Sequence, residues 1–266
     1  MQSKPTLVVM SLGISWFGFS QEPDWPKLFA ESQKTEVYAP VPPVVTPAET
    51  VNGAPSDAVI LFDGKNLDAW KYDASEPPGE TWSIQDGVLM VNKKAGGIVT
   101  KELFTDYQLH LEYRIPTNIS GEGQNRGNSG VFLAYLGMKD TYFEEGYELQ
   151  ILDNYNNSTY VNGQAGSVYK QAIPLANACK KPGEWQTYDI IWQAPRFKED
   201  GALDTPAYVT LIHNGVLVQN HAELKGQTVW IGEPYYSPHG PAPIRLQSHP
   251  DPSEPVSFRN IWLREL

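Results

Sequence analysis

Residues 107–115 read Tyr-Gln-Leu-His-Leu-Glu-Tyr-Arg-Ile, an alternation in which every second side chain is apolar or aromatic. In an extended strand successive side chains point to opposite faces, so the apolar positions share one face and the polar positions share the other. A strand with this pattern buries one face against a core and leaves the other open. The stretch therefore predicts a strand of an antiparallel sheet.

Similar short runs recur on both sides of this stretch, separated by Gly, Asn, Asp and Pro. They lie at residues 57–62, 87–91, 129–135, 146–152, 186–192, 208–213 and 258–264. Asn214-Gly215 stands between two apolar runs, which is a strong signal for a hairpin turn. No stretch of ten or more residues has the 3.6-residue period of a helix. The chain is therefore predicted to be all-β, a two-sheet antiparallel sandwich or jelly roll.

The N-terminal part of the chain differs from the rest in composition. Lys4 precedes an uncharged, mostly apolar run from Thr6 to Phe19, which is typical of a secretory signal peptide and short for a membrane span. We expect residues 1–20 to be a signal peptide and the protein to be exported, periplasmic or extracellular. Membrane association is expected only if this segment stays uncleaved. Residues 21–57 carry four prolines between 39 and 48, so we expect an arm or linker that could lie along the domain. The domain itself is expected at 58–266.

Composition narrows the class of partner. The net charge is −11 and no basic run is present, which argues against nucleic acid, because phosphate neutralisation requires clusters of Lys and Arg. Aromatic residues make up 12% of the chain, with 8 Trp and 14 Tyr. Flat rings stack on sugar faces, so this excess favours a carbohydrate partner, although Trp and Tyr also suit strands. The sequence lacks a nucleophile elbow, a phosphate-binding loop, a dinucleotide fingerprint and a zinc-type His/Cys pair.

The strand at residues 146–154 carries the strongest candidate site. Glu148 and Gln150 share one face of it, and Glu is a poor strand former that needs a reason to be there. A solvated surface strand is the alternative interpretation. Asp153 would join that face only if a β-bulge near Leu152 turned it there.

Further polar side chains could join this site from other segments. Arg126 and Asn128 lie in a Gly- and Asn-rich turn, and Tyr169 ends a second Gly-bracketed segment. Gln247 and His249 share one face of the alternating stretch 244–249, where an imidazole could transfer protons. The candidate catalytic residues are thus Glu148 and His249. The candidate substrate-binding residues are Arg126, Asn128, Gln150, Asp153, Tyr169 and Gln247.

Several of these motifs, in this order, resemble the 3-keto-disaccharide hydrolase family. The motifs are Leu61-Phe-Asp-Gly-Lys-Asn-Leu-Asp-Ala-Trp70, Thr81-Trp82 with Gly87-Val-Leu89, Gly127-Asn-Ser-Gly-Val-Phe132, Tyr147-Glu-Leu-Gln-Ile-Leu-Asp-Asn154, Gly183-Glu-Trp-Gln-Thr-Tyr188, Asn214-Gly-Val216 and Phe258-Arg-Asn-Ile261. The resemblance covers roughly residues 58–266. It implies a concanavalin A-like jelly roll that binds sugar on its concave sheet, and a hydrolase that cleaves glycosidic bonds.

The resemblance also implies a chemistry. A ketone at C3 acidifies the C2 proton of a glucosyl unit, a base removes that proton, and the resulting enolate expels the C1 substituent by β-elimination before water adds. Glu148 and His249 could be base and acid in either order, and Arg126, Gln150 or a divalent metal ion could hold the enolate. No cofactor is certain.

One segment departs from the family pattern. The family usually reads Leu-Gln-Asp-His-Gly where this chain has Leu246-Gln-Ser-His-Pro250, so Ser248 replaces a carboxylate beside His249. Two alternatives remain open. The chain could be a non-catalytic carbohydrate-binding module, or a conventional glycoside hydrolase that uses Glu148 and Asp153 as its paired carboxylates.

Overall fold

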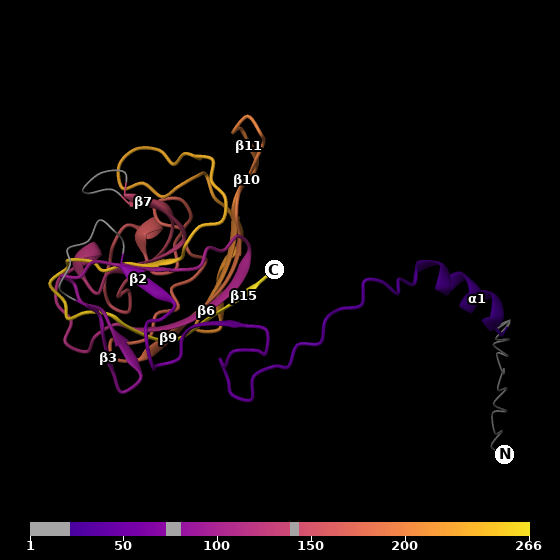
Figure 1. Cartoon of the computed structure of the whole chain (residues 1–266), viewed down its shortest axis with the longest axis horizontal. Coiled ribbons are helices and arrows are strands. Elements are labelled where there is room, and N and C mark those ends of the chain that lie inside the picture. The colour runs from indigo at the N-terminus through magenta and orange to yellow at the C-terminus, as the bar shows by residue number, and fades with distance from the viewer. Residues whose placement is uncertain (1–21, 73–80, 139–143) are drawn as a thin grey trace, which may run out of the picture. The chain divides into compact units, whose positions relative to one another are not determined.

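The computed structural model describes residues 22–72, 81–138 and 144–266, and the expected signal peptide lies outside them. The chain divides into two compact units, residues 1–44 and 45–266. The described part of the first unit contains the helix α1 (Trp25–Ser32) and the 3₁₀ turn η1 (Gln33–Thr35) (Figure 1). Asp24 caps α1 by accepting a hydrogen bond from the Lys27 amide at 3.3 Å. Within the described residues, no helix is long and apolar enough to span a membrane.

Two large antiparallel sheets form the body of the second unit (Figure 1). Within the described residues, the larger sheet has eight strands, in the order β13 (Val216–Glu223), β12 (Tyr208–His213), β9 (Trp185–Gln193), β6 (Tyr107–Arg114), β15 (Ser257–Glu265), β4 (Val88–Met90) and β3 (Ser83–Gln85), with β1 (Val59–Phe62) also pairing with β15. The smaller sheet has five, in the order β2 (Trp70–Tyr72), β5 (Ile98–Thr100), β14 (Arg245–Leu246), β7 (Ser129–Met138) and β8 (Glu144–Ile151). A short hairpin joins β10 (Arg196–Phe197) to β11 (Leu203–Thr205). The predicted all-β, two-sheet, concanavalin A-like jelly roll is confirmed.

The core lies between the two sheets and follows the alternation of the strands. On β6 the apolar side chains at 107, 109, 111 and 113 are fully buried in it, as the period-two pattern predicts. Burying each large side chain of this kind contributes roughly 1.5–3 kcal/mol. Two core tyrosines also join the sheets directly: Tyr107 Oη donates to the Leu133 carbonyl at 2.5 Å, and Tyr188 Oη donates to the Gln150 carbonyl at 2.7 Å. The second bond links β9 of the larger sheet to β8 of the smaller sheet, and β8 is the strand that carries the candidate site.

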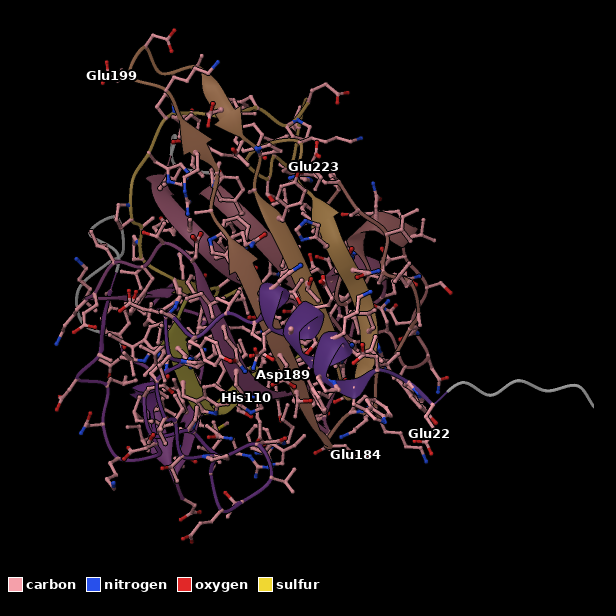
Figure 2. All side chains as sticks on the ribbon, turned by 90° about the vertical axis from the view of Figure 1, so that its right-hand side faces the viewer. Glu22, His110, Glu184, Asp189, Glu199 and Glu223 are labelled. Carbon is pink, nitrogen blue, oxygen red and sulfur yellow. The ribbon has the colours of Figure 1, made fainter. Side chains whose placement is uncertain are left out.

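The compact unit begins at residue 45, so residues 45–57 of the expected arm belong to the same unit as the domain. The Asn52 carbonyl accepts hydrogen bonds from Trp262 Nε1 at 3.0 Å and from Asn260 Nδ2 at 2.8 Å. Trp262 in turn stacks on His110, whose Nδ1 lies 2.6 Å from Asp189 Oδ1 on the outward face of β6 and β9 (Figure 2). His110 and Glu112, on the polar face of β6, are therefore buried, while Gln108 and Arg114 at its two ends are partly exposed.

His213, on β12, gives the fold a dependence on pH. Its ring is fully buried, and Nε2 lies 3.0 Å from both Gln186 Oε1 and Tyr113 Oη. Burial, helped by the Lys180 ammonium, lowers the pKa of His213 to about 3. An unfolded His titrates near pH ~6.5, so below that pH the unfolded state binds a proton that the folded state does not.

We therefore expect the free energy of unfolding to fall by about 2 kcal/mol between pH 7 and pH 5 through this residue. Urea titrations of wild type and His213→Gln at both pH values measure the effect. The change in the free energy of unfolding between the two pH values should be smaller in the variant by this amount. An equal change in the two proteins would show that His213 is not the source of the pH dependence.

Candidate functional site

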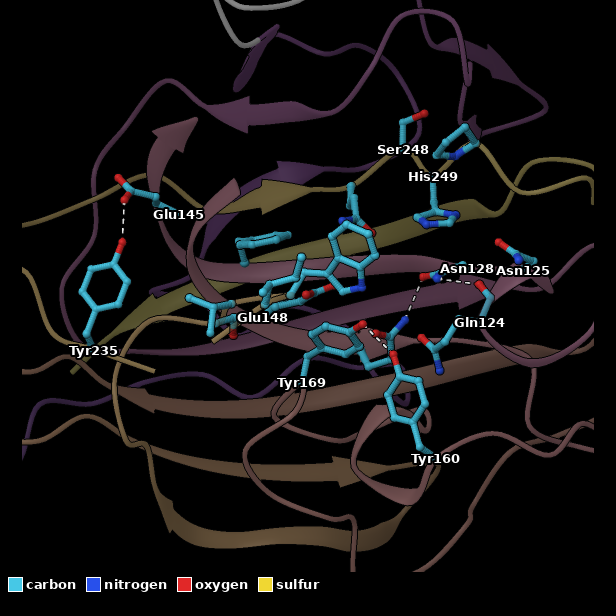
Figure 3. A pocket seen from close by; sticks show the side chains of 18 residues that line it. Gln124, Asn125, Asn128, Glu145, Glu148, Tyr160, Tyr169, Tyr235, Ser248 and His249 are labelled. Carbon is cyan, nitrogen blue, oxygen red and sulfur yellow. Dashed lines mark hydrogen bonds between the residues drawn. The ribbon is translucent and has the colours of Figure 1, made fainter. Parts of the chain in front are cut away.

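The candidate site is a pocket of about 840 Å³ on the side of the five-stranded sheet that faces away from the core (Figure 3). Such a volume suits a small-molecule ligand. Its lining combines carboxylate, imidazole, phenol, amide and apolar groups: Gln124, Asn125, Asn128, Phe132, Glu145, Glu148, Gln150, Tyr160, Tyr169, Thr228, Val229, Trp230, Ile231, Tyr235, Gln247, Ser248, His249 and Pro250.

Strand β8 contributes Glu148 and Gln150 to the pocket. Tyr147, Leu149 and Ile151 of the same strand pack into the core, so the alternation directs the two polar side chains to the opposite face. On the neighbouring strand β7, Gly130 lies opposite Gln150 in the register. A Cβ at Gly130 would stand 2.4 Å from Glu148 Oε1, so this glycine makes the room that the carboxylate occupies.

Two loops beyond β8 form one wall of the pocket. The residues from Gly166 to Tyr169 run along the edge of β8: Gly166 N donates to the Gln150 carbonyl at 2.9 Å, and Tyr169 N donates to the Glu148 carbonyl at 3.1 Å. Thr228 Oγ1 accepts from the Glu148 amide at 3.0 Å, which attaches the loop that contains Trp230. These bonds protect the edge strand, bring the Tyr169 phenol close to Glu148 and place Trp230 in the same pocket lining.

Tyr160 and Tyr169 form a hydrogen-bonded pair, with their hydroxyl oxygens 2.6 Å apart. Burial, the hydrogen bond with Tyr160 and the charge of Glu148 all raise the pKa of Tyr169. Burial and Glu148 also raise the pKa of Tyr160, against the opposing effect of the Tyr169 hydrogen bond. Both phenols are therefore protonated at neutral pH, and one hydroxyl of the pair can donate a hydrogen bond to a ligand.

The turn after β14 brings Ser248 and His249 to the other side of the pocket, across from Tyr160 and Tyr169 (Figure 3), and Gln247 of the same turn also lines the pocket. The His249 side chain is 28% exposed, and its Nδ1 lies 3.7 Å from Asp251 Oδ2. The sequence separates Glu148 from His249 by about a hundred residues, and the fold places both in one pocket lining.

The buried amide of Gln150 is committed to the protein. Its Nε2 faces three acceptors, Asn128 Oδ1 at 2.7 Å, the Ile151 carbonyl at 2.8 Å and the Ser129 carbonyl at 3.1 Å. An amide nitrogen has two hydrogens, so none remains for a ligand. Gln150 therefore has no N–H left to donate to an enolate oxygen, which differs from the role that the sequence suggested for it.

Arg126 and Asp153 were predicted from sequence to contact the substrate, but both lie outside the pocket lining. Arg126 Nε donates to Asp153 Oδ2 at 2.7 Å, and the Asp153 side chain is 2% exposed. Strand β8 ends at Ile151, so no bulge returns Asp153 to the face of Glu148. The pair instead joins the turn before β7 to the loop after β8. Asn128, Gln150, Tyr169 and Gln247, the other predicted contacts, all line the pocket.

The donor set does not fit a metal ion. Among the residues that the structure describes, no three His, Cys, Asp or Glu side chains form a group that could hold one. A divalent metal usually needs several oxygen or nitrogen ligands from the protein. The proton transfers at this site are therefore assigned to side chains alone.

Comparison with known proteins identifies the family. The model of the 3-keto-alpha-glucoside-1,2-lyase-like domain matches residues 57–264. The chain belongs to this family. The resemblance that the sequence motifs indicated is thus confirmed, and the matched residues contain the whole pocket lining.

Relatives of the chain include enzymes of carbohydrate cleavage. The 3-keto-disaccharide hydrolase of Bacteroides thetaiotaomicron is 25% identical over 159 residues, which are 50% of this chain and 51% of that protein. The chain thus matches about half the length of this relative. A crystal structure from Parabacteroides distasonis, of a protein assigned to the glycosyl hydrolases, is 57% identical with a TM-score of 0.79, and covers 88% of this chain and 96% of its own. A second from that organism, with the same assignment, is 25% identical with a TM-score of 0.53, over 79% and 99% of the two chains.

Proposed function

We propose that this chain cleaves the glycosidic bond of 3-keto-glucosides by β-elimination and then hydrates the product. The observation that carries the proposal is the joint placement of Glu148, His249 and the Tyr160–Tyr169 hydroxyl pair around one pocket of a member of this family. These groups match the needs of the reaction: two proton-transfer groups and a hydrogen-bond donor for a developing oxyanion.

The steps follow from the chemistry of the substrate. A base takes the proton from C2, and the electron pair moves to the C3 oxygen, which becomes an enolate. The C3 carbonyl then re-forms, a C1–C2 double bond appears, and the C1–O bond breaks with its electrons on the leaving oxygen, which takes a proton. Addition of water across C1 and C2 completes net hydrolysis. We propose that Glu148 and His249 divide the two proton transfers and that a tyrosine hydroxyl donates to the enolate.

A conventional glycosidase loses support because Asp153 lies outside the pocket, paired with Arg126. Glu145 does line the pocket, but its Oε1 accepts a hydrogen bond from Tyr235 Oη at 2.8 Å. The apolar surfaces of Phe132, Val229, Trp230 and Ile231 suit the C–H faces of a sugar ring.

The fate of the C2 proton tests the proposal. The protein is incubated in D₂O with 3-keto-glucosides and, separately, with the same glucosides unoxidised, and the products are analysed by mass spectrometry. We expect cleavage of the oxidised substrates alone, with one deuterium incorporated at C2 of the hydrated product.

Two other outcomes would identify the alternatives. Cleavage of unoxidised glucosides with the C2 hydrogen retained would indicate a conventional glycoside hydrolase. Binding of sugars without turnover of either series would indicate a carbohydrate-binding module. The double variant Glu148→Gln/His249→Gln is the control for uncatalysed elimination, which 3-keto-glycosides undergo slowly in solution.

A further inference from the structure

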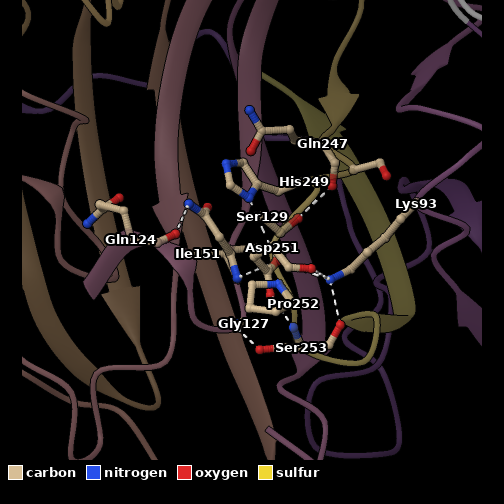
Figure 4. Close-up of polar contacts among 12 residues, drawn as sticks. Lys93, Gln124, Gly127, Ser129, Ile151, Gln247, His249, Asp251, Pro252 and Ser253 are labelled. Carbon is tan, nitrogen blue, oxygen red and sulfur yellow. Dashed lines mark hydrogen bonds and ion pairs between the residues drawn. The ribbon is translucent and has the colours of Figure 1, made fainter. Parts of the chain in front are cut away.

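Asp251, which the sequence motifs did not single out, is a buried carboxylate directly behind His249 (Figure 4). Its side chain is 1% exposed. Oδ1 accepts from the Ser253 backbone N–H at 2.9 Å. Oδ2 accepts from the Asn128 backbone N–H at 3.4 Å and lies 3.2 Å from Lys93 Nζ. These contacts fix the orientation of the carboxylate before any ligand binds.

Lys93 compensates the charge of this carboxylate. Besides Asp251 Oδ2, its ammonium donates to the backbone carbonyls of Asp251 and Ser253, each at 2.7 Å. Burial alone would raise the pKa of Asp251, but His249, the Ser253 amide and Lys93 together hold it well below its ordinary value. Asp251 therefore stays ionised at every pH at which the protein would work, as a permanent hydrogen-bond acceptor.

The imidazole of His249 has one buried and one accessible edge. Nδ1 is buried and has no hydrogen-bond partner among the described residues, while the side chain as a whole is 28% exposed. The exposed edge is therefore the one away from Nδ1, which carries Nε2. The acceptor nearest to Nδ1 is Asp251 Oδ2 at 3.7 Å, a distance that a small ring movement would shorten to a hydrogen bond.

We propose that Asp251 is the positioning residue that holds His249 in its Nδ1–H tautomer, so that the lone pair of Nε2 faces the pocket. A carboxylate accepts only a proton-bearing nitrogen, so its placement at Nδ1 selects this tautomer. The inference rests on the proposed function in one respect: it makes His249 the group that takes the C2 proton. Glu148 is then left with the proton transfer at the leaving oxygen.

Asp251 also supplies the carboxylate that is missing at position 248, where this chain has serine. Ser248 Oγ donates to the Asn92 carbonyl at 3.4 Å, so it does not support the imidazole. The carboxylate comes instead from Asp251, in the proline-flanked turn Pro250-Asp-Pro252. The chain thus supplies an acidic partner for His249 from a position after the histidine.

Long-range ¹H–¹⁵N NMR of the full chain tests the proposal without any substrate, because the two ring nitrogens of each tautomer have distinct shifts. The His249 signals are assigned by their loss in His249→Gln. We expect the Nδ1–H tautomer in wild type at neutral pH, and an increased Nε2–H population in Asp251→Asn, whose amide can turn an N–H toward Nδ1. Observation of the Nε2–H tautomer in wild type would overturn the proposal, even if the variant failed to fold.

Kinetics supply the second readout. Asp251→Asn should lower kcat on a 3-keto-glucoside by about 100-fold or more with KM little changed, because groups that orient a functional histidine contribute from about 10-fold to about 10⁴-fold. Ser253→Ala is the matched control, because it removes the hydroxyl that bonds Gly127 and Ser120 in the same turn but leaves the amide that holds Asp251. A folded Asp251→Asn with wild-type kcat would refute the proposal. Wild type that turns over no 3-keto-glucoside would refute the proposed function and leave the tautomer result standing.

Discussion

Glu148→Gln is expected to lower kcat on a 3-keto-disaccharide by about 10³-fold, within the range of general acid–base catalysis. The leaving oxygen of a sugar is a poor leaving group without a proton, and glutamine cannot supply one. Glutamine has nearly the same shape as glutamate, and Gly130 leaves the space that the side chain occupies, so the fold should be retained. Steady-state kinetics and a thermal melt measure the two effects.

A comparison of substrates with different leaving groups distinguishes loss of proton donation by Glu148 from a general loss of structure. With a 3-keto p-nitrophenyl glucoside, whose leaving oxygen departs without protonation, the same variant should lose less than about tenfold. Glu145→Gln is the matched control, because it removes a neighbouring carboxylate that also lines the pocket but is bonded to Tyr235. We expect a loss below about tenfold for that control. Equal losses on both leaving groups in Glu148→Gln would exclude it as the donor to the leaving oxygen.

The part of the site that lies on regular strands could be predicted from sequence. The period of two on β8 places Glu148 and Gln150 on one face and the core residues on the other, and the structure has this arrangement. The prediction for Asp153 failed at the point where the strand ends. Beyond Ile151 the alternation no longer applies, and the Asp153 carboxylate instead accepts hydrogen bonds from Arg126 and from the Tyr155 backbone amide.

The loop residues of the site could not be predicted in the same way. Tyr160 and Trp230 reach the pocket because their loops bond to β8, and nothing in their local sequence encodes those long-range contacts. Asp251 is a similar case. In sequence it is one acidic residue in a proline-rich turn, and its proximity to His249 and Lys93 depends on how that turn packs against the residues around 93 and 128. Neither the burial nor the partners of a carboxylate can be inferred from a turn motif.

The polar residues of the site also show why residue type alone did not determine role. Gln150 has the right position for a ligand contact, but three protein acceptors surround its amide nitrogen. In the bond between Tyr160 and Tyr169 one hydroxyl donates and the other accepts. The hydroxyl that accepts keeps its own hydrogen and can donate it to a ligand. An oxyanion donor is therefore better sought in the tyrosine pair than in the amides of the sheet.

His249→Ala is expected to lower kcat by about 10³-fold or more on both the disaccharide and the p-nitrophenyl substrate, because removal of the C2 proton precedes departure of either leaving group. Exchange of the C2 proton with D₂O should fall by the same factor, which NMR of the substrate measures independently of bond cleavage. His221→Ala is the control, since His221 is exposed on β13 of the other sheet and stacks on Tyr208. Its kinetics should match those of wild type.

The truncated side chain also allows a rescue experiment. His249 lines the pocket and is partly exposed, so its replacement by alanine leaves a space that opens to solvent. Added imidazole should enter that space and restore part of the C2 exchange, with a rate that increases with the concentration of its neutral form. Imidazole should restore exchange in His249→Ala because it replaces the base that removes the C2 proton. It should not change the leaving-group dependence of Glu148→Gln, because that variant lacks the group that protonates the leaving oxygen. A His249→Ala variant that still exchanges the C2 proton at the wild-type rate would transfer the role of base to Glu148.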